Sequence, residues 1–160
     1  MRVFLGIGSN LEPETHIQLV LNALRVNFGS LQLSSKYRTP AIGFIGPSFI
    51  NMAVSIETEL SAAEVAEHCQ RIERELGRDR STESGSCSRC IDIDLLLFED
   101  DRAESELPQP RADIRDFAYT AVPLADLMPD WRHDHTGGMR LADYIKCVRF
   151  SEQQLEIIEE

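Results

Sequence analysis

The chain of 160 residues is 42% hydrophobic and 27% charged, and 27 acidic against 16 basic residues give it a formal net charge of −11. This balance argues against a general binder of nucleic acid or of anionic membranes, because both ligands need a broad positive field. The length indicates one self-sufficient domain, residues 1–160. The apolar run 3–7 is too short for a signal-peptide core, and the uncharged stretch 39–56 contains glycine and proline, so we expect a cytoplasmic protein without a membrane span.

The first half of the chain alternates between strand and helix patterns. Residues 3–7 are an apolar run that ends at a Gly-Ser-Asn turn signal, which is typical of a buried strand. A helical stripe covers residues 13–28 and ends at Gly29. Residues 31–37 and 49–57 alternate with period two and are predicted strands, joined by a loop over residues 39–48 that holds two Gly and two Pro.

The second half repeats the order helix and then strand. Ser61 and Glu64 form a capping box that opens a helix ending at Gly77. Residues 78–88 are predicted to be a polar loop, residues 91–98 a strand, and the acidic run 99–106 a solvated turn. Short helical pieces follow at 125–127 and 141–148, before a solvated acidic tail. The βαββαβ order is typical of a ferredoxin-like α+β sheet with its helices on one face.

Arginine dominates the basic residues, since 14 of the 16 are Arg. Five of them fall within nineteen residues: Arg71, Arg74, Arg78, Arg80 and Arg89. A guanidinium group matches phosphate oxygens two at a time, so the cluster favours a small, highly charged ligand. The alternative is a surface on which these arginines pair with neighbouring Glu. A P-loop is excluded because the sequence has no GxxxxGK[ST] motif.

Asp92 and Asp94 stand two residues apart on the last predicted strand. Period two places the apolar Ile91, Ile93, Leu95 and Leu97 on one face and both carboxylates on the other, about 6.6 Å apart along the strand. Like charges so close are costly without a cation between them, and Mg²⁺ is commonly held by one or two carboxylates plus phosphate oxygens. An exposed polar strand face is the alternative. Together with the arginines, the pair favours a nucleotide triphosphate site.

A pocket for a flat ring is the third hypothesis. Thr39-Pro40, Ile42, Phe49 and Asn51 would form apolar walls with one amide, which offers a donor and an acceptor to a heterocycle. Phe49 could stack on the ring face, although a strand phenylalanine is more often core.

The four cysteines are expected to be reduced, incidental thiols: Cys69, Cys87, Cys90 and Cys147. Cys87-x2-Cys90 is half of a zinc motif, but no second pair follows it. Zinc therefore stays the less favoured alternative.

Five motifs occur in order and together resemble one family: Gly8-Ser9-Asn10, Tyr37-Arg-Thr-Pro40, Phe49-Ile-Asn51, Gln70-Arg-Ile-Glu73 with Gly77-Arg-x-Arg80, and Arg89-x-x-Asp-x-Asp94-Leu-Leu-Leu-Phe98. The set is similar to the 6-hydroxymethyl-7,8-dihydropterin pyrophosphokinases of folate biosynthesis, over about residues 2–130. The resemblance implies a three-layer ferredoxin-like fold. It also implies an ATP-dependent enzyme that transfers pyrophosphate to the pterin's hydroxymethyl oxygen and releases AMP.

The resemblance also implies roles for individual residues. Asp92 and Asp94 would bind two Mg²⁺ ions, and Arg78 and Arg89 would be catalytic residues of a loop that closes on ATP. The implied ATP contacts are Gln70, Glu73, Arg80 and Arg115. The implied pterin contacts are Thr39, Pro40, Ile42, Phe49, Asn51 and Phe117. The expected partners are the pterin and ATP alone, for a monomer that binds neither nucleic acid nor membrane.

Three departures from the family pattern fall near the site. The stretch Ser84–Arg89 lacks the family's Trp and is one residue longer, and Gln109 replaces a His. The segment between Phe117 and Pro123 is two residues longer than the family's. Two alternatives therefore stand beside an active pyrophosphokinase: a diverged pterin- or nucleotide-binding relative with weak or altered transfer, and a plain interaction domain.

Overall fold

A computed structural model describes residues 1–78, 90–99, 110–148, 150 and 153–158 of the chain. Within these residues six strands form one antiparallel sheet: β1 (Arg2–Ser9), β2 (Leu31–Leu33), β3 (Lys36–Thr39), β4 (Phe49–Glu57), β5 (Asp92–Glu99) and β6 (Glu156–Ile158). The hydrogen-bonded order is β5-β1-β4-β3-β6, and β2 also pairs with β4. The first strand of the chain, β1, thus lies between β4 and β5.

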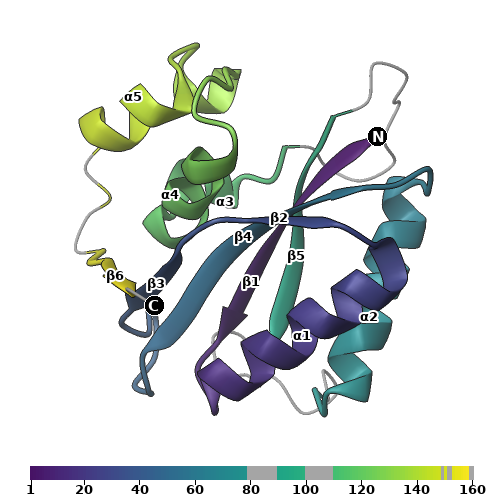
Figure 1. Cartoon of the computed structure of the whole chain (residues 1–160). Coiled ribbons are helices and arrows are strands. Elements are labelled where there is room, and N and C mark those ends of the chain that lie inside the picture. The colour runs from purple at the N-terminus through teal and green to yellow at the C-terminus, as the bar shows by residue number, and fades with distance from the viewer. Residues whose placement is uncertain (79–89, 100–109, 149, 151–152, 159–160) are drawn as a thin grey trace.

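Helices cover both faces of this sheet (Figure 1). The helices α1 (Pro13–Phe28) and α2 (Ala62–Glu75) lie on one face, and α3 (Asp113–Asp116), α4 (Ala118–Leu127) and α5 (Leu141–Cys147) lie on the other. A 3₁₀ turn, η1 (Asp134–Thr136), precedes α5. The predicted limits of α1 and the predicted capping box of α2 are confirmed. No described helix is long and apolar enough to cross a bilayer.

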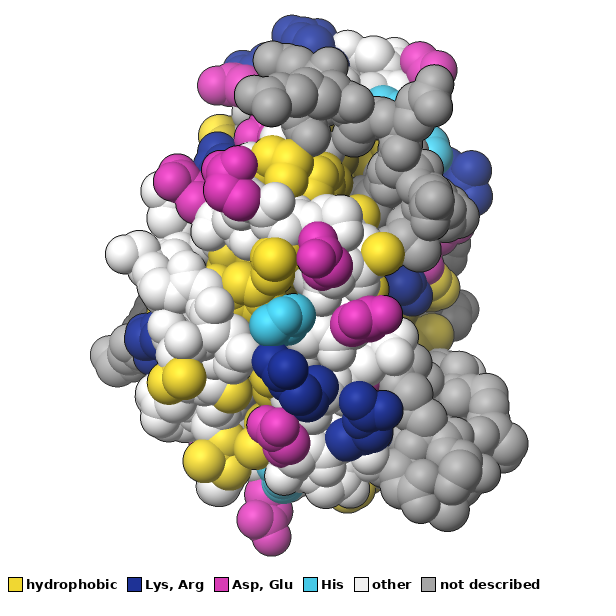
Figure 2. Space-filling model, turned by 90° about the vertical axis from the view of Figure 1, so that its right-hand side faces the viewer, with side chains coloured by type: hydrophobic (Ala, Val, Ile, Leu, Met, Phe, Trp, Pro, Cys, Tyr) yellow, Lys and Arg dark blue, Asp and Glu magenta, His cyan; other side chains and the backbone are white. Residues whose placement is uncertain are grey.

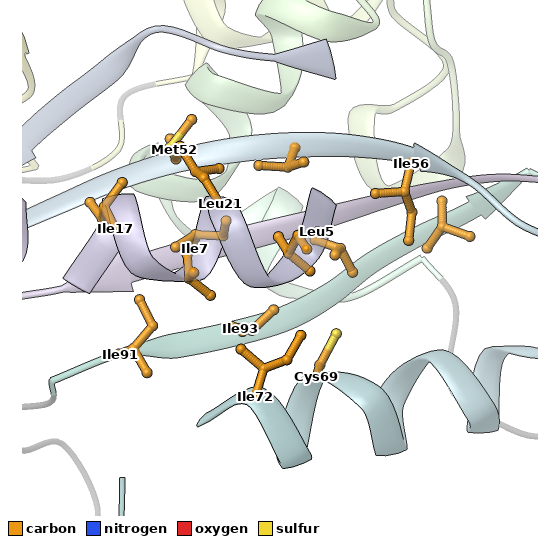
Figure 3. Packing of buried hydrophobic residues seen from close by; sticks show 14 of the residues in the cluster. Leu5, Ile7, Ile17, Leu21, Met52, Ile56, Cys69, Ile72, Ile91 and Ile93 are labelled. Atoms are coloured by element: carbon orange, nitrogen blue, oxygen red, sulfur yellow. The ribbon is translucent and has the colours of Figure 1, made fainter. Parts of the chain in front are cut away.

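Two hydrophobic clusters follow from the alternation of side chains along the strands. Leu5 and Ile7 of β1 face α1 and α2, where they join Ile93 of β5 and Ile72 of α2 (Figure 3). Phe4 points the other way and packs with residues of α3, α4 and α5. On the outer face that Figure 2 shows, acidic and basic side chains of the described residues are interspersed. Because the two hydrophobic clusters lie on opposite faces, the sheet is buried on both sides, as a three-layer arrangement requires.

The predicted strand 31–37 was wrong in its continuity, because the structure has two short strands there. Between them, Ser34 exchanges hydrogen bonds with Ala53 of β4: its N–H donates to the Ala53 carbonyl at 3.0 Å, and its Oγ accepts from the Ala53 N–H at 2.8 Å. The Ser35 N–H donates to the Asp126 carboxylate at 3.1 Å. Serine side chains that compete for backbone hydrogen bonds explain the break.

The predicted inward face of β5 was wrong at Leu97. The pairing of β1 with β5 shifts register between Phe4 and Leu5, which is the signature of a β-bulge. Beyond this bulge both Leu96 and Leu97 belong to the cluster under α4, whereas Ile93 belongs to the cluster under α2. One extra residue thus reverses the alternation that the sequence pattern implied.

The C-terminal third holds more regular structure than predicted. The helical piece expected at 125–127 is the end of a helix that begins at Ala118, and the tail contains β6. β6 pairs antiparallel with β3, so Glu156–Ile158 is a sheet edge and not merely a solvated acidic segment.

Candidate active site

A cavity of about 160 Å³ opens on the sheet face opposite α1 and α2. Seven side chains predicted from the sequence meet in its lining: Thr39, Pro40, Ile42, Phe49, Asn51, Asp92 and Asp94. They come from β3, from the loop over residues 40–48, from β4 and from β5. The cavity joins an apolar, amide-bearing end to a carboxylate end, two features that the sequence could identify only separately.

Two glycines of β1 line this cavity, each paired with polar residues of the neighbouring strands. Gly8 pairs with Asn51 on one side and with Asp92 on the other, and Gly6 pairs with Asp94. A Cβ at Gly8 would lie 2.9 Å from Oδ1 of Asn51, closer than real Cβ contacts allow. The glycine of the Gly-Ser-Asn motif therefore serves to admit the amide as well as to begin a turn.

The amide end is held in place by hydrogen bonds. Asn51 Nδ2 donates to Thr39 Oγ1 at 2.8 Å, and both side chains are buried. Phe44, which the sequence did not single out, meets Phe49 edge to face with ring centroids 6.2 Å apart. Asn10 Nδ2 donates to the Pro47 carbonyl at 3.1 Å, which ties the turn after β1 to the loop over residues 40–48. The pocket wall is thus anchored by the motif that follows β1.

The carboxylate end carries strong electrostatic strain. The side chain of Asp94 is 30% exposed and that of Asp92 is 16% exposed. Burial, together with the negative charge of Asp92, raises the pKa of Asp94 to about 6. No group of three or more His, Cys, Asp or Glu side chains within the described part of the chain is arranged to hold a metal ion. Two carboxylate ligands nevertheless fit Mg²⁺, which takes its other ligands from water and substrate phosphate.

Glu73 and Arg78 lie behind Asp92 and not in the cavity lining. Glu73 is 1% exposed, and its Oε1 accepts from the Ile93 N–H at 2.8 Å and from Arg78 Nη1 at 2.6 Å. The same Nη1 pairs with Asp92. Arg78 reaches this position because Gly77, at φ 92°, ends α2 and the Arg78 N–H donates back to the Glu73 carbonyl at 3.0 Å. In this structure Arg78 bridges Glu73 and Asp92. The contact of Glu73 with ATP and the catalytic role of Arg78 stay predictions.

Of the remaining predicted residues, those that the structure describes do not line the cavity. Gln70 is exposed on α2, and the exposed Arg115 pairs with its neighbour Asp116 at 2.7 Å. Arg80 and Arg89 lie outside the described residues, as does Cys87. Phe117 is absent from the lining, so its predicted position against a bound ring is not the one observed.

Tyr119 occupies the place that was predicted for Phe117. It lines the cavity, and its ring stacks on Phe117 with centroids 5.0 Å apart. Burial and the nearby carboxylates of Asp113 and Asp94 raise the pKa of Tyr119 to about 12, so the phenol is neutral. The two extra residues between Phe117 and Pro123 were the signal, because an insertion of that length moves the lining aromatic from 117 to 119.

Arg111 is a second residue that the sequence reasoning missed. Its Nη1 pairs with Asp94 Oδ1 at 3.0 Å, and its Nε donates to Asp113 Oδ2 at 2.6 Å. It lies two residues after Gln109, which replaces a His of the family, so its position in the sequence was a signal, but its contact with Asp94 could not be predicted.

Comparison with known proteins gives a consistent result. Residues 4–129 match the family model described as 7,8-dihydro-6-hydroxymethylpterin-pyrophosphokinase. A 2-amino-4-hydroxy-6-hydroxymethyldihydropteridine pyrophosphokinase of Porphyromonas gingivalis (strain ATCC 33277) is 37% identical over 139 residues, covering 82% of this chain and 92% of that protein. The protein of the same name from Bacillus subtilis (strain 168) is 35% identical over 131 residues, covering 78% of this chain and 76% of its own length.

A longer relative matches over only one part of its length. The folic acid synthesis protein fol1 of Schizosaccharomyces pombe is 36% identical over 138 residues. The match covers 83% of this chain but 19% of the yeast protein.

Proposed function

The chain belongs to the 7,8-dihydro-6-hydroxymethylpterin-pyrophosphokinase family, and we propose that it transfers a pyrophosphoryl group from ATP to the hydroxymethyl oxygen of 6-hydroxymethyl-7,8-dihydropterin, with release of AMP, in folate biosynthesis. The observation that carries this proposal is the single cavity that contains both Phe49 and Asn51 and both Asp92 and Asp94. A ring bound at the first pair would present its substituent to the second pair.

The apolar end suits a pterin. Phe49 and Tyr119 offer aromatic faces, and ring stacking adds to the gain from burying a flat heterocycle. Because Asn51 Nδ2 already donates to Thr39, its amide oxygen is the group left to accept from ring N–H donors. The loop over residues 40–48 supplies Ile42 and Phe44 as further apolar cover that excludes water.

The carboxylate end suits a cation and a polyphosphate. Asp92 and Asp94 would hold Mg²⁺, two ions in the full site. Bound there, the metal would neutralise phosphate charge and lower the pKa of the attacking hydroxyl. Glu73 and Arg78 keep Asp92 directed toward the cavity. Because no separate general base is then required, none is assigned. From the family resemblance, Arg80, Arg89 and Arg115 are proposed to contact the polyphosphate.

The remaining features of the proposal concern the whole chain. The order β5-β1-β4-β3, with β2 and β3 taken as one broken strand, supports a ferredoxin-like sheet. Both hydrophobic clusters share this sheet, which supports a single domain. We further propose a cytoplasmic monomer whose partners are the pterin and ATP alone, since a net charge of −11 disfavours nucleic acid and anionic membranes as ligands.

The test of the function is a direct assay. The purified protein is incubated with ATP, Mg²⁺ and 6-hydroxymethyl-7,8-dihydropterin, and the nucleotide products are separated. We expect AMP to form in proportion to the pterin diphosphate, and neither product to form when the pterin is left out. Formation of ADP, or pterin binding without transfer, would favour the diverged relative suggested by the missing Trp and by Gln109.

Phe49→Ala is expected to weaken pterin binding by about 1–3 kcal/mol, because it removes both the stacking face and the buried area of the ring. The measurement is calorimetric titration with the pterin. Phe28→Ala is the matched control, since Phe28 lies at the end of α1 on the other face of the sheet. Unchanged affinity in the Phe49 variant would place the pterin elsewhere.

The same titration distinguishes the two candidates for the second ring. Tyr119→Ala is expected to weaken pterin binding as much as Phe49→Ala does, and Phe117→Ala to weaken it less, because only Tyr119 lines the cavity. A larger loss for the Phe117 variant would restore the position predicted from the sequence.

A further inference from the structure

Each pocket carboxylate pairs with its own arginine, and each arginine contacts a second carboxylate. Asp92, Arg78 and Glu73 form one such trio, whose arginine side chain is 3% exposed. Asp94, Arg111 and Asp113 form the other, whose arginine side chain is 42% exposed. The two arginines therefore differ in exposure: the Arg78 side chain is buried, and the Arg111 side chain is in contact with solvent.

Arg111 is anchored from two directions besides its contact with Asp94. Its backbone N–H donates to the Leu96 carbonyl at 2.9 Å, which fixes the chain beside β5. Its Nε donates to Oδ2 of Asp113, the first residue of α3. Figure 1 shows α3 on the face of the sheet that carries the cavity. A guanidinium held in this way keeps its charge next to Asp94 even when Asp94 takes another partner.

The second carboxylate matters because a cation would compete for Asp94. A divalent cation and a guanidinium repel each other, so a lone Arg–Asp pair would come apart when a cation bound. Asp113 gives Arg111 a partner that lies outside the cavity lining. The guanidinium has five N–H donors, and its contacts with Asp94 and Asp113 use Nη1 and Nε. Donors thus remain for phosphate oxygens, which a guanidinium binds well.

We propose that Arg111 is a polyphosphate-binding residue, that Asp113 is the positioning residue that holds it, and that its charge makes cation and nucleotide binding depend on each other. Before nucleotide arrives, Arg111 offsets the charge of Asp94, so the cavity binds a bare divalent cation weakly. Once a cation is on the carboxylates, the retained guanidinium attracts the polyphosphate. This inference rests on the proposed function and assigns to Arg111 a contact with the ATP of that reaction.

The test measures binding and does not depend on turnover. Arg111→Gln, Arg111→Lys, Asp113→Asn and the double variant Arg111→Gln/Asp113→Asn are compared with wild type. Binding of a non-hydrolysable ATP analogue in saturating Mg²⁺ is followed by calorimetry, and binding of Mn²⁺ alone by electron paramagnetic resonance. Arg140→Gln is the matched control, because its side chain is also 42% exposed and also contacts two carboxylates, Asp130 and Asp143.

The expected pattern has opposite signs for the two ligands. Arg111→Gln should weaken analogue binding about tenfold to a hundredfold, the range for a lost hydrogen bond to a charged group, and should tighten Mn²⁺ binding. Arg111→Lys should recover part of the lost analogue affinity, because lysine keeps the positive charge but cannot bind two phosphate oxygens at once as a guanidinium does. Asp113→Asn should weaken analogue binding less than Arg111→Gln does. The double variant should bind the analogue as weakly as Arg111→Gln alone. Thermal stability should change little, as for Arg140→Gln, because partly exposed ion pairs contribute little to it.

Two results would overturn the proposal. A parallel loss of Mn²⁺ and analogue binding would show that Arg111 only maintains the shape of the site, and unchanged analogue affinity would show that it does not meet the polyphosphate. Either result would leave the proposed function standing if wild type still releases AMP. Conversely, wild-type protein that binds the analogue but releases no AMP would count against the function and not against Arg111.

Discussion

Replacement of Asp94 by alanine is expected to reduce AMP release more than about a hundredfold, beyond the typical cost of losing a residue that merely supports a metal ligand. The reason is that two carboxylates, Asp92 and Asp94, lie at the polar end of the cavity, and the proposed reaction needs both to hold Mg²⁺ against the polyphosphate. Initial rates at saturating ATP, Mg²⁺ and pterin are the measurement.

The same variant should fold normally. Burial and the charge of Asp92 raise the pKa of Asp94, and its ion pair with Arg111 is partly exposed, so alanine would forfeit little stability there. Asp130→Ala is the control, since that exposed carboxylate also pairs with an arginine but does not line the cavity. A variant that keeps wild-type turnover would remove Asp94 from the metal site.

Replacement of Arg78 by methionine is expected to lower the free energy of unfolding by about 3–5 kcal/mol, the usual cost of removing one partner from a buried ion pair. Glu73 is 1% exposed, and without the guanidinium its buried carboxylate would lose the ion pair with Arg78 and keep the hydrogen bond from the Ile93 N–H. Denaturant unfolding without ligands measures the effect.

Two further variants make this prediction specific. Arg38→Met should lower the free energy of unfolding by at most about 1 kcal/mol, because Arg38 and Glu14 form an exposed ion pair at 3.9 Å. Adding Glu73→Gln to Arg78→Met should recover part of the lost stability, since glutamine can still accept from Ile93 without carrying a charge. If Arg78→Met is as stable as Arg38→Met, the buried trio does not form in solution.

Local signals predicted the helices well. The limits of α1 follow from proline at its start and Gly29 after its end, and α2 begins at its capping box, because caps and turns are decided by residues three or four apart. Binary alternation also predicted which residues of β4 face the cavity, with Phe49 and Asn51 on one side and Ile50 and Val54 on the other. The sequence, read together with the family resemblance, identified the seven lining residues as candidate site residues.

Contacts between segments that are distant in the chain could not be predicted from the sequence. The bulge that moves Leu97 to the other cluster depends on how β5 registers against β1, and the break at Ser34 depends on β4. Tyr119 and Arg111 acquire their positions from the packing of α3 and α4 on the sheet. The pairing of β6 with β3 joins residues more than a hundred positions apart.

The arginines illustrate the difference between what the sequence determines and what the tertiary structure decides. The sequence by itself determined that arginine is preferred, that five arginines cluster near the carboxylate pair, and that the overall charge is negative. Only the tertiary structure decided which arginine does what: it buries Arg78 between Glu73 and Asp92, holds Arg111 at Asp94, and leaves Arg115 on the surface with Asp116. The physical reason is that an ion pair depends on distance and burial in three dimensions, and neither quantity follows from spacing along the chain.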